Sequence, residues 1–330
     1  MRSERRSSTR HERIHAHIPI LAVLALCVAS ASVVGAGEPV ARVKFEIQNN
    51  RIIFPMKVGD SRELSILLDS GATLQGVYLF HEELIEELGL SDGTEQRVAG
   101  AGSGEASRTV MKEGATLHAG GVEFHDQQVF VSRSPQTQRF PRDGVAGYTL
   151  FGSYVVEIDY DSMTLALHDP DGFEPDSSWE SLEMTLRPRI PWIEISVVVA
   201  GEKEIPASVY IDLAAGDALL LLVKPEMKFE LPEGLEQRYI GTGLSGDIHG
   251  GIGRVRSVKI GPYRLENVVT AFPPAEVRSK QEGADGIIGN DLMRRFNVIF
   301  DYGNERLYLK PNRHFETPFE LESATAPVNR

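Results

Sequence analysis

The strongest constraint on the fold is an internal repeat. Residues 143–167 recur as residues 285–309 with no insertion, and nine of the 25 aligned positions are identical, far more than composition alone would give. Both copies begin with Asp-Gly, two apolar residues and Gly, and both continue through regularly spaced apolar residues to an Asp-Tyr pair. Self-similarity at a fixed offset indicates duplicated structure. We interpret the chain as a tandem duplication of one supersecondary unit.

A carboxylate at the end of an apolar run stands out upstream of the first copy. Two leucines lead into Asp69, which is followed by Ser70, Gly71, an alanine and Thr73. Aspartate is a poor strand former, and a carboxylate carried inward must be hydrogen-bonded or share a proton. Ser70, the amide of Gly71 and Thr73 can supply hydrogen bonds. Gly71 also lets the backbone turn tightly and approach the carboxylate.

The duplication supplies a second carboxylate. Extending the alignment backward, with a one-residue insertion, places Tyr-Ile-Asp-Leu-Ala-Ala-Gly at residues 210–216 against the first stretch. A pseudo-twofold axis would then bring Asp69 and Asp212 face to face. Two adjacent carboxylates cannot both ionise cheaply, so one keeps a proton while the other is a base. A water held between them can attack a polarised amide carbonyl, and the pair titrates jointly.

The rest of the chain reads as β-structure. Short alternating runs predict strands at residues 43–47, 52–58, 63–68, 109–117 and 129–131, with one brief helix near residues 81–88 and glycine-rich tips at 98–104 and 241–246. We therefore predict an all-β fold of two tandem lobes. The predicted boundaries are a signal peptide at residues 1–36, a first lobe at 37–168, a Pro-, Asp- and Ser-rich linker at 169–181, a second lobe at 182–312 and a loosely ordered tail at 313–330.

The N-terminus has the pattern of an export signal. Five arginines precede the apolar run 18–34, and small residues follow it at the positions that an export peptidase reads. We expect a periplasmic or secreted protein, with an uncleaved membrane anchor as the alternative. The single cysteine, Cys27, lies in this segment, so the remaining chain can form neither disulfides nor thiolate sites.

The charge of the chain argues against a nucleic-acid partner. The formal net charge is −13. Residues 1–36 hold five arginines and two glutamates, so the remainder has 29 basic and 45 acidic residues, a net of −16. A phosphate backbone is bound by the opposite kind of surface.

Together, the Asp-Ser-Gly-Ala-Thr string at 69–73, the two Asp-Gly-apolar-apolar-Gly segments and the duplication resemble the aspartic peptidases. The likeness is to the retropepsin-like and pepsin-like bilobal type of exported bacterial proteins, and it covers about residues 43–310. It implies a catalytic dyad of Asp69 and Asp212, with Ser70 as the hydroxyl that braces the two loops. It also implies that residues 145–147 and 287–289 run beneath those loops, and that the glycine tips are flap-like hairpins over a groove for a peptide or protein substrate. No cofactor and no metal is implied.

The second motif departs from the family pattern. Leu213 stands where the bracing hydroxyl belongs, and Ala214 stands where the glycine belongs, so we expect the Ala214 methyl to crowd the site. Three hypotheses therefore stay open: a monomeric aspartic endopeptidase, which leads; a decayed relative that binds extended peptides; and a homodimer that pairs two copies of Asp69.

Other motifs have plainer interpretations. Asp143 and Asp285 precede glycine and are predicted to bond backbone amides in turns, and the aspartates of the two Asp-Tyr pairs, Asp159 and Asp301, are predicted to be structural. The glycine pattern at 241–246 matches a dinucleotide fingerprint, but no helix is expected after it.

Overall fold

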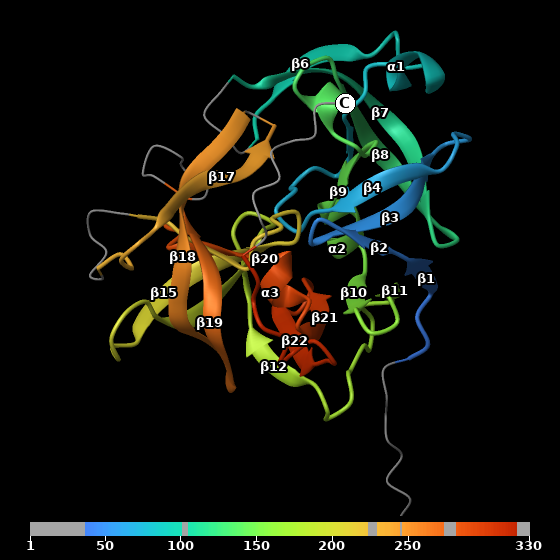
Figure 1. Cartoon of the computed structure of the whole chain (residues 1–330). Helices are drawn as coiled ribbons and strands as arrows, with labels where there is room; N and C mark the ends of the chain where they lie inside the picture. The colour runs from blue at the N-terminus through green and yellow to red at the C-terminus, as the bar shows by residue number, and fades with distance from the viewer. Residues whose placement is uncertain (1–36, 101–104, 224–229, 245, 274–281, 322–330) are drawn as a thin grey trace, which may run out of the picture. The chain divides into compact units, whose positions relative to one another are not determined.

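The structure of the chain is a computed structural model that describes residues 37–100, 105–223, 230–244, 246–273 and 282–321. The predicted signal peptide, the end of the first glycine-rich tip and the last nine residues lie outside these ranges (Figure 1). No helix in the described ranges has the length and hydropathy needed to cross a membrane.

The first lobe is built on a closed β-barrel. Its strands are β2 (Glu46–Gln48), β3 (Arg51–Val58), β4 (Leu64–Leu68), β5 (Gly76–Leu79), β6 (Thr94–Val98), β7 (Ser107–Ala119), β8 (Val122–Ser132) and β9 (Gly144–Ala146). They follow the order β2-β3-β4-β9-β5-β8-β7-β6, and pairing of β3 with β7 closes six of them into a ring. Three short helical turns complete the lobe: α1 (Leu84–Glu87), η1 (Thr137–Arg139) and α2 (Tyr148–Phe151). The predicted strands 52–58 and 63–68 correspond closely to β3 and β4.

The second lobe repeats this barrel. Its strands are β13 (Thr185–Leu186), β14 (Pro191–Val198), β15 (Ile205–Asp212), β16 (Leu219–Leu221), β17 (Glu236–Gly243), β18 (Gly246–Ile260), β19 (Tyr263–Phe272) and β20 (Gly286–Gly289), and α3 (Asn290–Met293) follows β20. The order is β13-β14-β15-β20-β16-β19-β18-β17, and pairing of β14 with β18 closes the ring. The all-β fold of two tandem lobes, predicted from the duplication, is confirmed.

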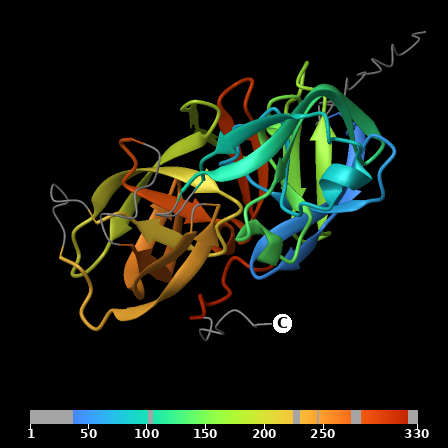
Figure 2. The same cartoon turned by 90° about the horizontal axis from the view of Figure 1, so that it is seen from above.

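A third sheet joins the two repeats. It contains β1 (Ala41–Lys44), β10 (Val155–Asp159), β11 (Thr164–His168), β12 (Glu180–Glu183), β21 (Phe296–Asp301) and β22 (Arg306–Pro311), in the order β1-β11-β10-β21-β22-β12. At its centre β10 pairs with β21, its equivalent in the repeat, with Val156 opposite Phe300 and Ile158 opposite Val298. The repeat offset maps Val156 onto Val298 and Ile158 onto Phe300. The pairing is therefore symmetric about the Glu157–Ile299 pair, and a pseudo-twofold axis passes there. Figure 2 shows the first lobe, blue to green, and the second lobe, yellow to orange, beside each other.

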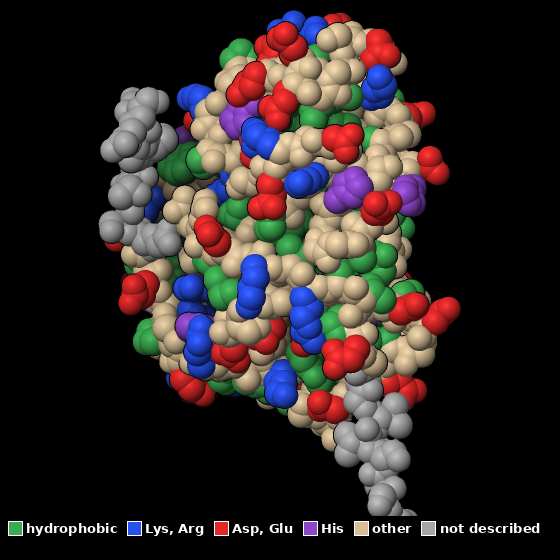
Figure 3. Space-filling view, turned by 90° about the vertical axis from the view of Figure 1, so that its right-hand side faces the viewer, with side chains coloured by type: hydrophobic (Ala, Val, Ile, Leu, Met, Phe, Trp, Pro, Cys, Tyr) green, Lys and Arg blue, Asp and Glu red, His purple; other side chains and the backbone are tan. Residues whose placement is uncertain are grey.

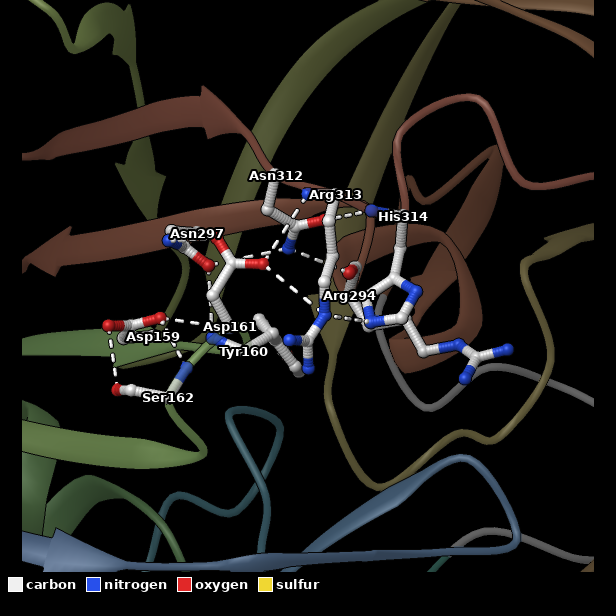
Figure 4. Close-up of polar contacts among 9 residues, drawn as sticks. All are labelled: Asp159, Tyr160, Asp161, Ser162, Arg294, Asn297, Asn312, Arg313 and His314. Atoms are coloured by element: carbon white, nitrogen blue, oxygen red, sulfur yellow. Dashed lines mark hydrogen bonds and ion pairs between the residues drawn. The ribbon is translucent and has the colours of Figure 1, made fainter.

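Polar contacts reinforce this junction at the turn after β10. The amide of Tyr160 donates to Asn297 Oδ1 at 3.0 Å, and Asn297 Nδ2 donates to Asp161 Oδ2 at 3.3 Å. Arg313 lies 3.6 Å from Asp161, which brings the segment after β22 into the same group (Figure 4). The first repeat is thus tied to the second by side chains as well as by the shared sheet.

The segment after β22 is more ordered than its composition suggests. Arg295 Nη1 donates to His314 O at 3.1 Å, and its guanidinium lies 4.0 Å from the ring centroid of Phe319, which is buried. Arg254 donates to Phe319 O at 2.9 Å. Residues 313–321 were expected to be loosely ordered; they instead pack on the second lobe because a buried ring and two arginines hold them.

The outer surface carries mixed charge. On the face shown in Figure 3, acidic and basic side chains are interspersed. His118 and His125 flank Glu123 on the β7–β8 hairpin, at 3.6 and 3.4 Å. These two histidines are solvated members of a hairpin surface.

Candidate active site

The two predicted aspartates end equivalent strands. Asp69 directly follows β4, which runs parallel to β9 with Leu68 opposite Ala146, and the Asp69 amide donates to Ala146 O at 3.0 Å. Asp212 is the last residue of β15, which runs parallel to β20 with Asp212 opposite Gly289. Each aspartate therefore lies at the carboxyl end of the equivalent strand of its repeat.

The segments predicted to lie beneath the aspartate loops do lie there. The amide of Tyr148 donates to Ala72 O at 3.0 Å, and the amide of Asn290 donates to Ala215 O at 2.8 Å. The glycine of each segment is required by close backbone packing. A Cβ on Gly147 would stand 1.8 Å from Asp69 O, and a Cβ on Gly289 would stand 2.1 Å from Asp217 O.

The structure brings the two carboxylates together. A Cβ on Gly71 would lie 3.1 Å from Asp69 Oδ1 and 3.5 Å from both Cγ and Oδ2 of Asp212, so this glycine faces both groups. Both aspartates are deeply set, yet part of each residue stays open to solvent. A water molecule can therefore reach a pair that is otherwise enclosed by protein.

Backbone amides stabilise both carboxylates. Asp69 Oδ1 accepts from the Gly71 amide at 2.7 Å and the Ala72 amide also lowers its pKa, while Asp212 Oδ1 accepts from the amides of Ala214 and Ala215 at 2.9 and 3.1 Å. Burial raises the pKa of both carboxyls. The charge of Asp212 raises the pKa of Asp69 further, while the two amides and the charge of Arg51 oppose the rise in the pKa of Asp212. The pair therefore shares one proton, and the amide bonds and the charge of Arg51 favour Asp212 as its ionised member.

Ser70 braces the two loops, as the family resemblance implies. Its hydroxyl donates to Ile211 O at 2.7 Å and accepts from the Leu213 amide at 3.1 Å, although both partners are more than 140 positions away. Ser70 is buried and Leu213 is fully enclosed. The reciprocal brace is absent because Leu213 has no hydroxyl. One side chain makes both connections between the loops.

Replacing Ser70 with alanine is expected to destabilise the chain by about 1–3 kcal/mol, because the Ile211 carbonyl and the Leu213 amide lose their buried partner. Urea unfolding measures this difference. The matched control is Ser153→Ala at an exposed serine, for which we expect a change within about 0.5 kcal/mol. Equal stability of the two variants would contradict the bracing role.

The Ala214 methyl does not take the place that the sequence suggested. The Ala214 amide keeps its hydrogen bond to Asp212, and its side chain packs on a buried group that we call the inner apolar cluster. The methyl therefore points to apolar neighbours, unlike a methyl at Gly71, which would face both carboxylates. The members of the cluster are Ile53, Leu67, Tyr78, Phe80, Phe130 and Val145.

Thr73 is not a carboxylate ligand. Among the described residues its hydroxyl makes no hydrogen bond to either aspartate, and its carbonyl accepts from Arg189 Nη1 at 3.1 Å. Ser70 likewise bonds the opposite loop rather than Asp69. Of the three groups proposed to bond the first carboxylate, only the Gly71 amide does so.

The raised pKa of Asp69 predicts a pH dependence of stability that does not depend on the reaction. The folded chain holds this proton more tightly than the unfolded chain. The free energy of unfolding therefore falls as pH rises from the ordinary carboxyl pKa of about 4 to the raised pKa of the folded state, and it is constant above that value. In Asp69→Asn this loss is absent. The stability of the variant relative to wild type should then increase with pH, by at most about 1.4 kcal/mol per pH unit. Unfolding at several pH values tests this, and a constant difference would contradict a buried protonated Asp69.

The glycine-rich tips of the β6–β7 and β17–β18 hairpins contact each other, and the second of them also contacts the first lobe. A Cβ on Gly100 would lie 2.4 Å from the Leu244 side chain, and Gln136 Nε2 donates to Gly243 O at 2.8 Å. A cavity of about 470 Å³ adjoins this contact and is lined by Arg108, Gln136 and Leu244 among others, but by neither aspartate. Residues 101–104 and Ser245 of these tips lie outside the described ranges. The 241–246 pattern ends a hairpin, so it is not a dinucleotide site.

The remaining repeated aspartates are structural, as predicted. Asp143 Oδ2 accepts from the Ser65 amide at 2.7 Å, and Asp285 Oδ2 accepts from the Ser208 amide at 2.9 Å, the equivalent bond in the second repeat. The carboxylate of Asp159 caps the turn after β10.

Asp301 caps the turn after β21 by accepting from the Asn304 amide at 3.0 Å.

Comparison with known protein families and with curated proteins found no match.

Proposed function

We propose that this protein is an aspartic endopeptidase whose dyad is Asp69 and Asp212 of one chain. The observation that carries the proposal is the proximity of these two carboxylates, which both lie within 3.5 Å of the Cβ position of Gly71 and are each presented by one copy of a duplicated loop. Because one proton is shared and solvent can reach the pair, the geometry suits activation of a water molecule.

The chemistry follows from the unequal environments. Ionised Asp212 takes a proton from a water molecule while the water oxygen attacks the amide carbon. Asp69 gives its proton to the carbonyl oxygen. When the tetrahedral intermediate collapses, the C–N bond breaks. Asp212 then returns its proton to the leaving nitrogen, and Asp69 recovers its own from the former carbonyl oxygen. These reaction steps use no cofactor. Peptidase activity should decline as pH rises through the raised pKa of Asp69.

The pairing of Asp69 with Asp212 within one chain supports a monomer as the active unit rather than a dimer of two Asp69 loops. Export of the enzyme to the periplasm or beyond is part of the proposal, and it rests on the arginine-flanked apolar run at residues 18–34.

The second candidate function is peptide binding without cleavage. Leu213 favours this function because it stands at the position equivalent to Ser70 and has no hydroxyl to hydrogen-bond the first loop. In the described part of the chain, Ser70 supplies the hydroxyl hydrogen bonds between the two loops, to Ile211 O and from the Leu213 amide.

A peptide library tests the proposal. The purified chain is incubated with unfolded protein and mixed peptides from acid to neutral pH, and new termini are identified by mass spectrometry. We expect internal cleavage. Saturable binding with no cleavage at any pH would overturn the peptidase and favour the binding protein.

A further inference from the structure

Equivalent turns in the two lobes each carry an arginine. In the first lobe, Arg51 opens β3 after a turn at Asn49 and Asn50, whose φ values are 49° and 56°. In the second lobe, Arg189 lies in the turn between β13 and β14, with a φ of 72°. The strand pairs β2–β3 and β13–β14 stand first in the order of their sheets, so the two turns correspond to each other in the duplicated fold.

Arg51 binds the second aspartate loop. Its Nε donates to Ala214 O at 2.7 Å, and its Nη1 donates to Asn49 O of its own turn at 3.0 Å. A Cβ on Gly216 would lie 2.9 Å from both Nη1 and Asn49 O, so this glycine lets the loop pack directly against the arginine and its turn. The Ala214 amide donates in turn to Asp212 Oδ1. One guanidinium therefore ties the loop of Asp212 to the first lobe.

Arg189 makes the reciprocal contact with the first aspartate loop. Its Nη1 donates to Thr73 O at 3.1 Å, and its guanidinium lies 4.2 Å from the ring centroid of Tyr148. Tyr148 opens α2 beneath that loop, and its amide donates to Ala72 O at 3.0 Å. A guanidinium over an aromatic ring gains cation–π attraction in addition to its hydrogen bond. Arg189 therefore contacts, from the second lobe, both the loop of Asp69 and the segment that supports it.

The backbone of Arg189 supports a role for its side chain. Turn positions with a positive φ favour glycine, asparagine or aspartate, and other residues adopt this conformation at a cost in free energy. The equivalent turn of the first lobe uses two asparagines, whereas Arg189 is an exposed arginine in the left-handed region. The contacts of this side chain offset the cost of the backbone conformation.

The two arginines add connections between the lobes where the second loop has lost one. Because Leu213 has no hydroxyl, the direct hydrogen bonds between the loops come from Ser70. Each arginine adds a hydrogen bond from a charged donor, which is stronger than one from a neutral donor. Apposition of the carboxylates requires both loops to stay in place, since a displacement of about 1 Å in a site can cost about a hundredfold in rate.

We propose that Arg51 and Arg189 are a reciprocal pair of positioning residues. Each holds the aspartate loop of the opposite lobe, and together they keep Asp69 and Asp212 apposed. This inference rests on the proposed function, since the two loops carry the proposed dyad. Both arginines act through backbone carbonyls of the loops rather than on the substrate.

Amide hydrogen exchange, followed by NMR, tests this crossed arrangement without any need for activity. Arg51→Met and Arg189→Met keep a long side chain and remove its donors. In Arg51→Met we expect the amides of residues 213–215 to exchange about tenfold faster, relative to amides of β10 and β21, which report global unfolding. In Arg189→Met the faster amides should be those of residues 71–73.

The matched control is Arg256→Met. Arg256 Nη1 also donates to a backbone carbonyl, Gly201 O, but this contact lies within the second lobe. We expect exchange in both aspartate loops, and peptide cleavage, to be unchanged in this variant. In both positioning variants we expect kcat to fall about tenfold while KM stays within about threefold, because the substrate contacts are intact and the dyad is not.

The two measurements separate failure of the positioning role from failure of the peptidase. If the wild type cleaves peptides, faster exchange in the arginine's own lobe or in neither loop would overturn the proposal and leave the peptidase standing. The crossed exchange pattern with an unchanged kcat would also overturn the positioning role. Absence of cleavage by the wild type, together with the crossed pattern, would overturn the peptidase and support the two arginines as residues that hold the loops.

Discussion

Asp69→Asn should lower kcat/KM for peptide cleavage by a factor of about 10² to 10⁴, the range associated with a positioned proton donor. The amide of asparagine can still donate to Asp212, but it cannot release a proton to the carbonyl oxygen of the substrate. Because the folded state no longer contains a buried carboxyl at this position, stability at neutral pH should not fall. Steady-state kinetics on a folded variant measures the loss.

The matched control is Asp92→Asn. Its side chain is 74% exposed and pairs with Lys112 at the surface. The control therefore makes the same Asp-to-Asn replacement at a residue that is neither buried nor close to a second carboxylate. We expect its kcat/KM to stay within about twofold of wild type, consistent with a small surface effect. Loss of activity in both variants would indicate a general effect of charge, and retention of activity in Asp69→Asn would remove this residue from the mechanism.

Gly147→Ala should damage both stability and activity. A Cβ at this position would stand 1.8 Å from Asp69 O and 3.0 Å from Ala72 O, and both are backbone atoms that no side-chain rotation can move away. The aspartate loop must separate from the segment beneath it. We expect a loss of about 3 kcal/mol or more in the free energy of unfolding, the upper range for overpacking. Any folded fraction should cleave poorly, because Asp69 is displaced from Asp212.

Two further glycine-to-alanine substitutions serve as comparisons for Gly147→Ala. Gly289→Ala makes the equivalent clash in the second repeat, 2.1 Å from Asp217 O, and should cost a similar amount. Gly303→Ala meets its nearest atom at 3.6 Å, an ordinary contact, and should change stability little. Chemical unfolding of all three variants compares them directly. A Gly147→Ala chain as stable as Gly303→Ala would show that the loop does not rest on the segment beneath it.

Most of the fold was predictable because the duplication and the alternating apolar pattern act together. Alternation located β3 and β4 within a residue, and the repeat offset implied that whatever holds Asp69 also holds Asp212. The helix predicted near residues 81–88 is confined to the single turn α1, and Gly89, with a positive φ of 64°, follows its C-cap Leu88.

The parts of the site that sequence reasoning missed depend on contacts between distant residues. Arg51 reaches Ala214 across 163 positions, and no local pattern signals that contact. The direction of the Ala214 methyl follows from the loop conformation rather than from residue type. The order of residues 313–321 depends on Arg295 and Arg254, which lie on other strands and turns. The available signals were the two aromatic residues of this stretch, Phe315, which packs against Tyr263 and Phe296, and the buried Phe319.

The central claim is that one chain supplies both members of the dyad, and kcat/KM of Asp212→Asn tests it most directly. The measurement uses protein shown by sedimentation to be monomeric, alongside wild type and Asp69→Asn. We predict that both variants lose activity by a similar factor, and that an equimolar mixture of them does not recover it. An Asp212→Asn chain that cleaves as well as wild type would contradict the claim, because a dyad would then have to be built without Asp212.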